Sequence, residues 1–225
     1  MHRLSAGIIT LCLISTPASA RTLSLTGHFM QGGLITGQTN PGAKVSLDGK
    51  KLRVSPDGLF VFGLGRNAES EVVIKTKLPS GEIYLENFEI EKRKYRIQRI
   101  NGLPKKMVTP SPETMDRIRR EGKAIRSARA VFTMATHFRA GFIWPSKGQI
   151  SGVYGSQRIL NGESRQPHLG VDIAAPKGTP VLASAAGKVT LAEMDLYFTG
   201  GTIIIEHGHG LSTVYSHLSE IEVRK

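Results

Sequence analysis

The sequence contains a single cysteine, Cys12, and that residue lies within the first 20 positions. A chain with no other thiol builds neither a disulfide framework nor a thiolate zinc site, so any metal site must use histidines and carboxylates. No apolar run approaches the ~20 residues that a transmembrane helix needs, which excludes a multi-pass membrane protein. Acidic residues are also few, because 18 Asp and Glu stand against 30 Lys and Arg, giving a net charge of +12.

Residues 1–20 predict a secretory signal peptide. Arg3 belongs to a short basic start, residues 4–14 are mostly apolar, and Ala-Ser-Ala at positions 18–20 forms a small-residue cleavage site. Cleavage after Ala20 removes the lone cysteine with the leader. We therefore expect an exported protein with no membrane-spanning segment after cleavage.

The positive charge indicates a polyanionic neighbour. Nucleic acid is the usual partner of a basic protein, but the chain has no recognition-helix motif and no aromatic-rich platform for single strands. Export points away from nucleic acid as well. Cell-wall polymers and anionic envelope surfaces are the better prediction.

Residues 21–91 are predicted to form a small antiparallel β-sandwich. Turn signals recur at close intervals, such as Asn-Pro-Gly at 40–42 and Pro-Asp-Gly at 56–58. Short runs of alternating apolar residues separate these turns, which is typical of an all-β domain. The expected strands include residues 44–47, 52–54, 59–62, 72–74 and 83–85.

Residues 92–140 are expected to form a basic linker followed by an amphipathic helix. Ser111 can cap this helix, and Pro112 suits its first position. Apolar residues then repeat at helical spacing, at Met115, Ile118, Ile125 and Phe132. We expect this stripe to pack against one of the two flanking domains.

Residues 141–225 are predicted to form a second all-β unit, in which the histidines concentrate. Runs rich in glycine and β-branched residues indicate strands at 149–154, 181–183, 188–191, 202–206 and 212–217. The whole chain is therefore assigned to the all-β class with one connecting helix.

His168 and Asp172 are the first candidate pair for chemistry. Prolines and glycine around them disfavour a helix. In a straight strand their Cα atoms would lie about 13 Å apart, too far to share a metal ion bound at ~2 Å, so the chain must bend, and Gly170 supplies the place. An imidazole and a carboxylate brought together suit zinc, and a His–Asp hydrogen bond in a loop is the alternative.

A second group of histidines follows in the sequence Glu-His-Gly-His-Gly at 206–210. Side chains two apart on a strand face the same way, so His207 and His209 could both point at a metal ion. The two glycines instead favour a hairpin turn between residues 202–206 and 212–217, where the histidines have no chemical role. His217, on the returning strand, is the better catalytic candidate.

These segments of residues 141–225 resemble the M23 (LytM/lysostaphin-type) zinc metallopeptidases. The resemblance rests on His-Leu-Gly-Val-Asp at 168–172, Glu-His-Gly at 206–208 and Tyr-Ser-His-Leu at 215–218. It implies a compact antiparallel sheet with a groove, a Zn²⁺ ion bound by His168 and Asp172, and His217 as a catalytic histidine. It also implies an endopeptidase that hydrolyses the peptide cross-links of peptidoglycan. A weaker resemblance of the N-terminal part to bacterial envelope members of the family implies a periplasmic location.

One departure from the family pattern concerns the third zinc ligand. In the family this ligand and a second catalytic histidine come from a His-x-His motif after the Tyr-x-His-Leu strand, whereas the given sequence ends at Lys225, eight residues past His217. We therefore expect a C-terminally truncated peptidase domain, unless His207 or His209 is the third ligand. The alternatives are a non-catalytic LytM-type protein that binds cell wall or regulates an amidase, and an inactive fragment.

Overall fold

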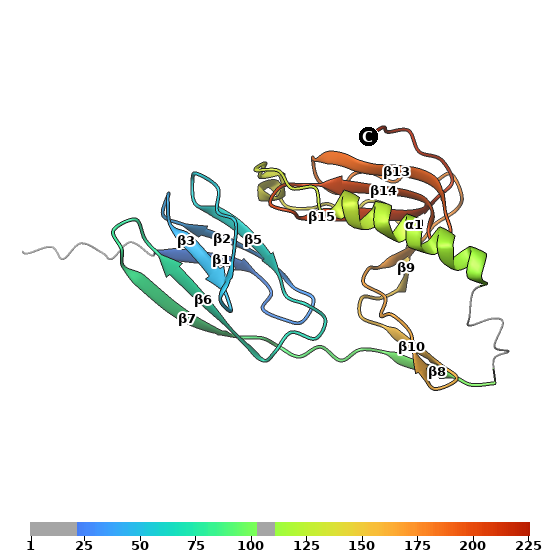
Figure 1. Ribbon diagram of the computed structural model, residues 1–225, viewed down its shortest axis with the longest axis horizontal. Coiled ribbons are helices and arrows are strands. Elements are labelled where there is room, and N and C mark those ends of the chain that lie inside the picture. Colours follow the sequence, from blue (N-terminus) through green and yellow to red (C-terminus); the bar gives the residue numbers. More distant parts are fainter. Residues whose placement is uncertain (1–21, 103–110) are drawn as a thin grey trace, which may run out of the picture.

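The computed structural model describes residues 22–102 and 111–225, so the predicted signal peptide lies outside the described residues. Figure 1 shows two β-rich units joined by an extended segment, with a helix lying across the second unit. The predicted all-β class with one connecting helix is confirmed. No helix within the described ranges is both long and apolar enough to cross a membrane.

The N-terminal unit consists of two antiparallel sheets packed face to face. One sheet has the order β1-β2-β5 and the other β4-β3-β6-β7. Alternating side chains point into the space between them, where Ile35, Phe60 and Ile74 are fully buried. The bounds are β1 (Leu23–Gly27), β2 (Leu34–Thr39), β3 (Lys44–Leu47), β4 (Lys50–Lys51), β5 (Leu59–Gly63), β6 (Glu71–Lys77) and β7 (Ile83–Glu89).

One expected strand of this unit, at 52–54, is wrong. Leu52 and Val54 do pack against the buried core, but from an irregular segment. The amide of Leu52 donates to the carbonyl of Val45 at 2.9 Å, and no strand of the described residues pairs with the residues that follow. Leu52 and Val54 alternate with polar residues because both pack against the core, and this segment does not pair with a strand as the pattern predicted.

The segment between the two units contains a strand that the sequence did not reveal. β8 (Ile97–Ile100) pairs in parallel with β10 (Gln157–Leu160), and β10 pairs antiparallel with the short β11 (Glu163–Ser164). The basic linker is therefore hydrogen-bonded into the C-terminal unit.

The helix α1 (Pro112–Arg129) begins as its caps predict. The Ser111 hydroxyl accepts a hydrogen bond from the Thr114 amide at 3.3 Å. Its apolar stripe packs on the C-terminal sheet, where Ile125 and Ala128 meet a buried group formed by Leu191, Leu196 and Ile204. The helix ends before Phe132, so the predicted extension of the stripe to that residue is wrong.

The C-terminal unit is built on β13 (Lys188–Leu196), β14 (Gly200–Glu206) and β15 (Ser212–Leu218), paired antiparallel in that order. A separate antiparallel pair consists of β9 (Gln149–Gly152) and β12 (Asp172–Ala174). The expected strand at 181–183 is wrong, because this segment is irregular and its Leu182 is held by a single backbone bond to Pro145. A short 3₁₀ turn, η2 (His137–Ala140), lies between α1 and β9.

Candidate functional site

The β9–β12 pair places the carboxylate of Asp172. Asp172 is the first residue of β12 and lies opposite Gly152, the last residue of β9. A Cβ at Gly152 would lie 2.0 Å from the Asp172 Oδ2 atom, so only glycine leaves room for this carboxylate. The pairing of β12 with β9 therefore determines the position of the exposed Asp172 side chain.

His168 lies before the bend and is brought to Asp172. Its Nε2 atom lies 3.2 Å from Asp172 Oδ1, and its Nδ1 atom lies 3.4 Å from the carbonyl oxygen of Val153. In the tautomer that donates from Nδ1 to Val153, the Nε2 lone pair is free to bind a cation. The chain thus bends between the two residues, as a shared site requires.

This pair of donors fits zinc. Two ligands bound at ~2.1 Å to a tetrahedral zinc ion are separated by roughly 3.4 Å, and the Nε2–Oδ1 distance here is 3.2 Å. Nitrogen and carboxylate oxygen are both ordinary zinc ligands. Nowhere in residues 22–102 and 111–225 do three or more His, Cys, Asp or Glu side chains gather as a possible metal site, so a metal ion at this pair would have two protein ligands among the described residues.

His217 lies on β15, in a different sheet from Asp172. Its side chain is exposed, and in the described part of the chain no hydrogen bond or ion pair joins it to His168 or Asp172. Its backbone has φ of 61°, the left-handed region that residues other than glycine seldom adopt. The amide of His217 donates to the carbonyl of Thr199 at 2.8 Å, which connects this unusual backbone to the turn between β13 and β14.

Side chains of helix α1 bind the turn between β13 and β14. The Glu121 carboxylate accepts from the Tyr197 amide at 2.7 Å, and Arg117 bridges Glu121 and Asp195 at 2.6 and 3.0 Å. The connector helix is therefore coupled to the backbone of His217 through a single turn.

His207 is a core histidine, and the structure does not place it in a metal site. It is fully buried, with Nδ1 2.6 Å from the Ala186 carbonyl oxygen and Nε2 2.8 Å from the Thr213 hydroxyl. A ring nitrogen that close to a carbonyl must carry the proton, and the hydroxyl of Thr213 occupies the second ring nitrogen. Phe142 packs edge-on against the ring.

His209 lies against the aromatic rings of Phe132 and Phe138, at centroid distances of 6.1 and 5.3 Å. Burial lowers the pKa of its imidazole below the ordinary value. The guanidinium of Arg53, from the N-terminal unit, lies over the Phe132 ring, 4.9 Å from its centroid. His209 therefore belongs to a contact between the two units.

Glu206 is a structural carboxylate that the sequence analysis did not single out. It is 1% exposed, and its oxygens accept from the Gly208 amide at 2.9 Å, the Gly210 amide at 3.3 Å and the Thr133 hydroxyl at 2.7 Å. A carboxylate directly before a glycine-rich turn was the available signal. It holds the hairpin and the segment after α1 together.

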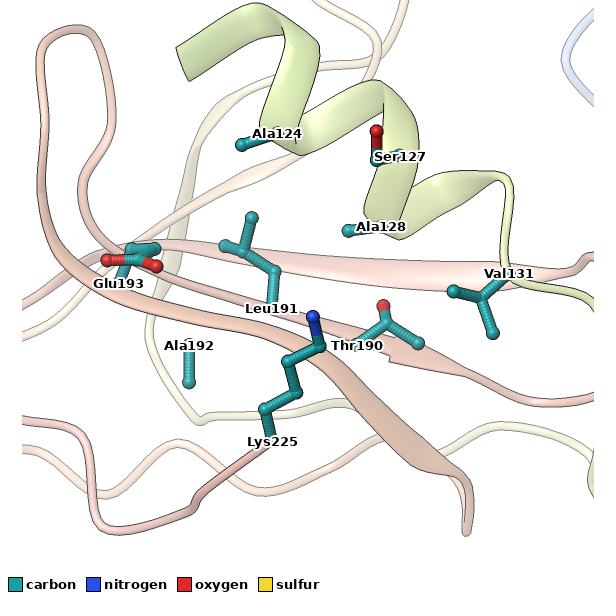
Figure 2. Close-up of a pocket in the computed structure, with 9 residues that line it drawn as sticks. All are labelled: Ala124, Ser127, Ala128, Val131, Thr190, Leu191, Ala192, Glu193 and Lys225. Atoms are coloured by element: carbon teal, nitrogen blue, oxygen red, sulfur yellow. The ribbon is translucent and has the colours of Figure 1, made fainter. Parts of the chain in front are cut away.

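A pocket of about 290 Å³ lies away from these histidines, between α1 and β13 (Figure 2). Small and apolar side chains line it, together with Glu193 and Lys225. Its lining contains no histidine and a single acidic side chain, so it offers no set of metal ligands. The candidate site is the exposed surface around His168 and Asp172.

Residues 166–225 match the model of peptidase family M23. This match confirms the predicted family resemblance over the segment that contains all three candidate residues. A solved structure from Pseudomonas aeruginosa, named as an M23 peptidase, is similar with a TM-score of 0.62 and 25% identity, covering 87% of this chain and 76% of that one. The similarity in fold therefore extends well beyond the matched segment.

Two curated proteins are similar over parts of the chain. The cell division protein DipM of Caulobacter vibrioides is 32% identical over 120 residues, which are 52% of this chain and 18% of that protein. The peptidoglycan DD-endopeptidase ShyA of Vibrio cholerae is 40% identical over 81 residues, which are 36% of this chain and 19% of that protein. The chain thus spans about a fifth of the length of these relatives.

Proposed function

Because residues 166–225 are related to peptidase family M23, we propose that this protein is an exported zinc-dependent endopeptidase that hydrolyses peptide cross-links of peptidoglycan. The observation that carries the proposal is the 3.2 Å approach of His168 Nε2 to Asp172 Oδ1 inside the matched segment. A relative named as a peptidoglycan DD-endopeptidase supports the substrate. The basic charge of +12 suits a site of action on an anionic envelope, in the periplasm.

In this proposal His168 and Asp172 hold the metal ion. Zinc bound there supplies Lewis-acid chemistry to the scissile carbonyl. Val153 fixes the tautomer of His168, and pairing with Gly152 fixes Asp172. His217, exposed on β15, serves as the general base or stabilises charge on the tetrahedral intermediate, because an imidazole can both accept and donate a proton.

The test uses the full chain without its predicted leader, incubated with purified cross-linked peptidoglycan. Mass spectrometry of the released fragments identifies the bond cut, before and after chelation and zinc re-addition. We expect His168→Ala and Asp172→Ala to lose activity at least ~100-fold together with bound zinc. His217→Ala should lose activity to a similar extent while retaining zinc. The exposed His28, on the N-terminal unit, provides the matched control His28→Ala.

A non-catalytic role in cell-wall binding or amidase regulation is the second candidate. The observation that favours it is the two-ligand set, since catalytic zinc sites normally use three protein ligands. His168→Ala separates the two functions. Full biological activity of this variant would establish binding or regulation and refute the endopeptidase.

A further inference from the structure

The loop between β9 and β10 makes the contacts that orient His168. The carbonyl of Val153 faces the Nδ1 atom of His168 at 3.4 Å. The Gly155 amide donates to the His168 carbonyl at 2.7 Å, and the His168 amide donates to the Ser156 carbonyl at 2.8 Å. This loop, residues 153–156, therefore holds the ring and both backbone groups of His168, so a displacement of the loop displaces the imidazole.

The N-terminal β-sandwich holds the same loop from its other side. Arg66 follows β5, and its Nε donates to the Gly155 carbonyl at 2.8 Å. Its guanidinium stacks over the ring of Tyr95 at 4.2 Å, and the Tyr95 hydroxyl donates back to the Arg66 carbonyl at 2.9 Å. Gly155 thus accepts from Arg66 and donates to His168, and so joins the β-sandwich to His168 by two hydrogen bonds.

Two glycines make this approach possible. Gly155 has φ of 82°, and a Cβ there would lie 2.0 Å from the Tyr95 ring. A Cβ at Gly32, in the β-sandwich, would lie 2.4 Å from the ring of Tyr154. The half-buried Tyr154 ring also has the guanidinium of Arg93 5.8 Å from its centroid. The fit is close on both sides of the loop, which limits how far residues 153–156 can move.

We propose that Arg66 is a positioning residue for His168, acting through Gly155, so that docking of the β-sandwich sets the geometry of a metal ligand in the other unit. This inference rests on the proposed function, because it takes His168 as a zinc ligand. Arg66 itself contacts neither metal nor substrate. Partners that orient a metal ligand typically change metal affinity 10–100-fold when removed, and Arg66 is one residue farther out.

The opposite role for the same contact makes a different prediction. A β-sandwich that merely restrains or covers the site would, on release, leave zinc affinity unchanged and raise activity. A β-sandwich that positions His168 would, on release, weaken zinc binding and lower activity. The sign of the change therefore separates the two.

The experiment compares Arg66→Ala, Arg66→Lys and Tyr95→Phe with the parent, all as the full chain. The matched control is Arg53→Ala, which removes a stacked arginine from the contact of the β-sandwich with Phe132 and leaves the loop 153–156 untouched. Zinc affinity is measured by competition with a chelator. Hydrogen exchange of the Gly155 and His168 amides is measured without metal.

We expect Arg66→Ala to weaken zinc binding about 10-fold and to speed exchange of the two amides by a similar factor. Arg66→Lys should be intermediate, since lysine can reach the carbonyl but loses the planar stack on Tyr95. Tyr95→Phe keeps the ring under Arg66 and removes only the hydroxyl that donates to the Arg66 carbonyl, so it should weaken zinc binding less than Arg66→Ala does. Arg53→Ala should stay within about 2-fold of the parent in both measurements.

Equal zinc affinity and equal amide exchange in Arg66→Ala and Arg53→Ala would overturn the positioning role. So would a rise in peptidoglycan hydrolysis on loss of Arg66. Absence of zinc binding by the parent chain would overturn the proposed function itself, and this result appears in the parent measurement alone. The two failures are therefore distinguishable.

Discussion

Replacing His207 by alanine is expected to destabilise the C-terminal unit by about 3–5 kcal/mol and to leave zinc affinity unchanged. His207 is fully buried and its two hydrogen bonds go to the Ala186 carbonyl and the Thr213 hydroxyl. Both hydrogen bonds are partly buried, and the loss of each costs about 1 kcal/mol. Deleting the ring against Phe142 leaves a cavity that costs roughly another 2 kcal/mol.

The assay has two parts, both on the full chain. Urea denaturation, monitored by hydrogen exchange of the amides in β14 and β15, gives the stability of the C-terminal unit separately from that of the β-sandwich. A zinc titration at a temperature where the variant remains folded gives the affinity. His137→Ala is the control, because this histidine is exposed on η2.

The result that would refute this reasoning is a stable His207→Ala variant that has lost zinc. It would show that His207 turns from its core position to become the third ligand. Loss of stability with retained zinc affinity would exclude His207 as a zinc ligand.

Three further predictions concern other parts of the site. Burial lowers the pKa of His209 below 6.5, so the stabilisation by its neutral form is complete above that pH and is lost as the pH falls through the lowered pKa. Urea midpoints measured at several pH values should show this loss of stability, and His209→Phe should make the midpoint less dependent on pH. Glu121→Ala releases the turn that holds the His217 backbone, and should lower kcat about 10-fold with little change in KM; an equal change in both would contradict a positioning role. Gly152→Ala places a Cβ against the Asp172 carboxylate and should weaken zinc binding about 10-fold; unchanged affinity by chelator competition would show that Asp172 is not a ligand.

The features that the sequence predicted well are local ones. The α1 cap needs only Ser111 and its own helix, and the strands of the β-sandwich are bounded by their own turns. The bend between His168 and Asp172 likewise followed from residues inside a short segment. Local rules of this kind operate over a few residues and can be applied without knowing the rest of the fold.

The features that the sequence did not predict depend on distant partners. β8 is paired with β10, far along the chain, and its run of Ile-Gln-Arg-Ile gives no sign of which strand it joins. The role of His207 was ambiguous for the same reason, since the carbonyl that occupies its Nδ1 atom belongs to Ala186. Arg66 carries no motif at all, and its contact with Gly155 spans 89 positions.

The parallel pairing of β8 with β10 has a consequence for dividing the protein into fragments. A fragment that begins at residue 141 would contain the predicted peptidase unit but not β8. The edge of β10 that pairs with β8 would then be unpaired, with its backbone amides and carbonyls open to solvent. Such an edge invites self-association, so poor behaviour of that fragment would say nothing about catalysis. A fragment that begins near residue 92 retains the strand, and an exchange of β-sandwiches between related proteins would be made best at that point, where the chain leaves one sheet and has not yet entered the next.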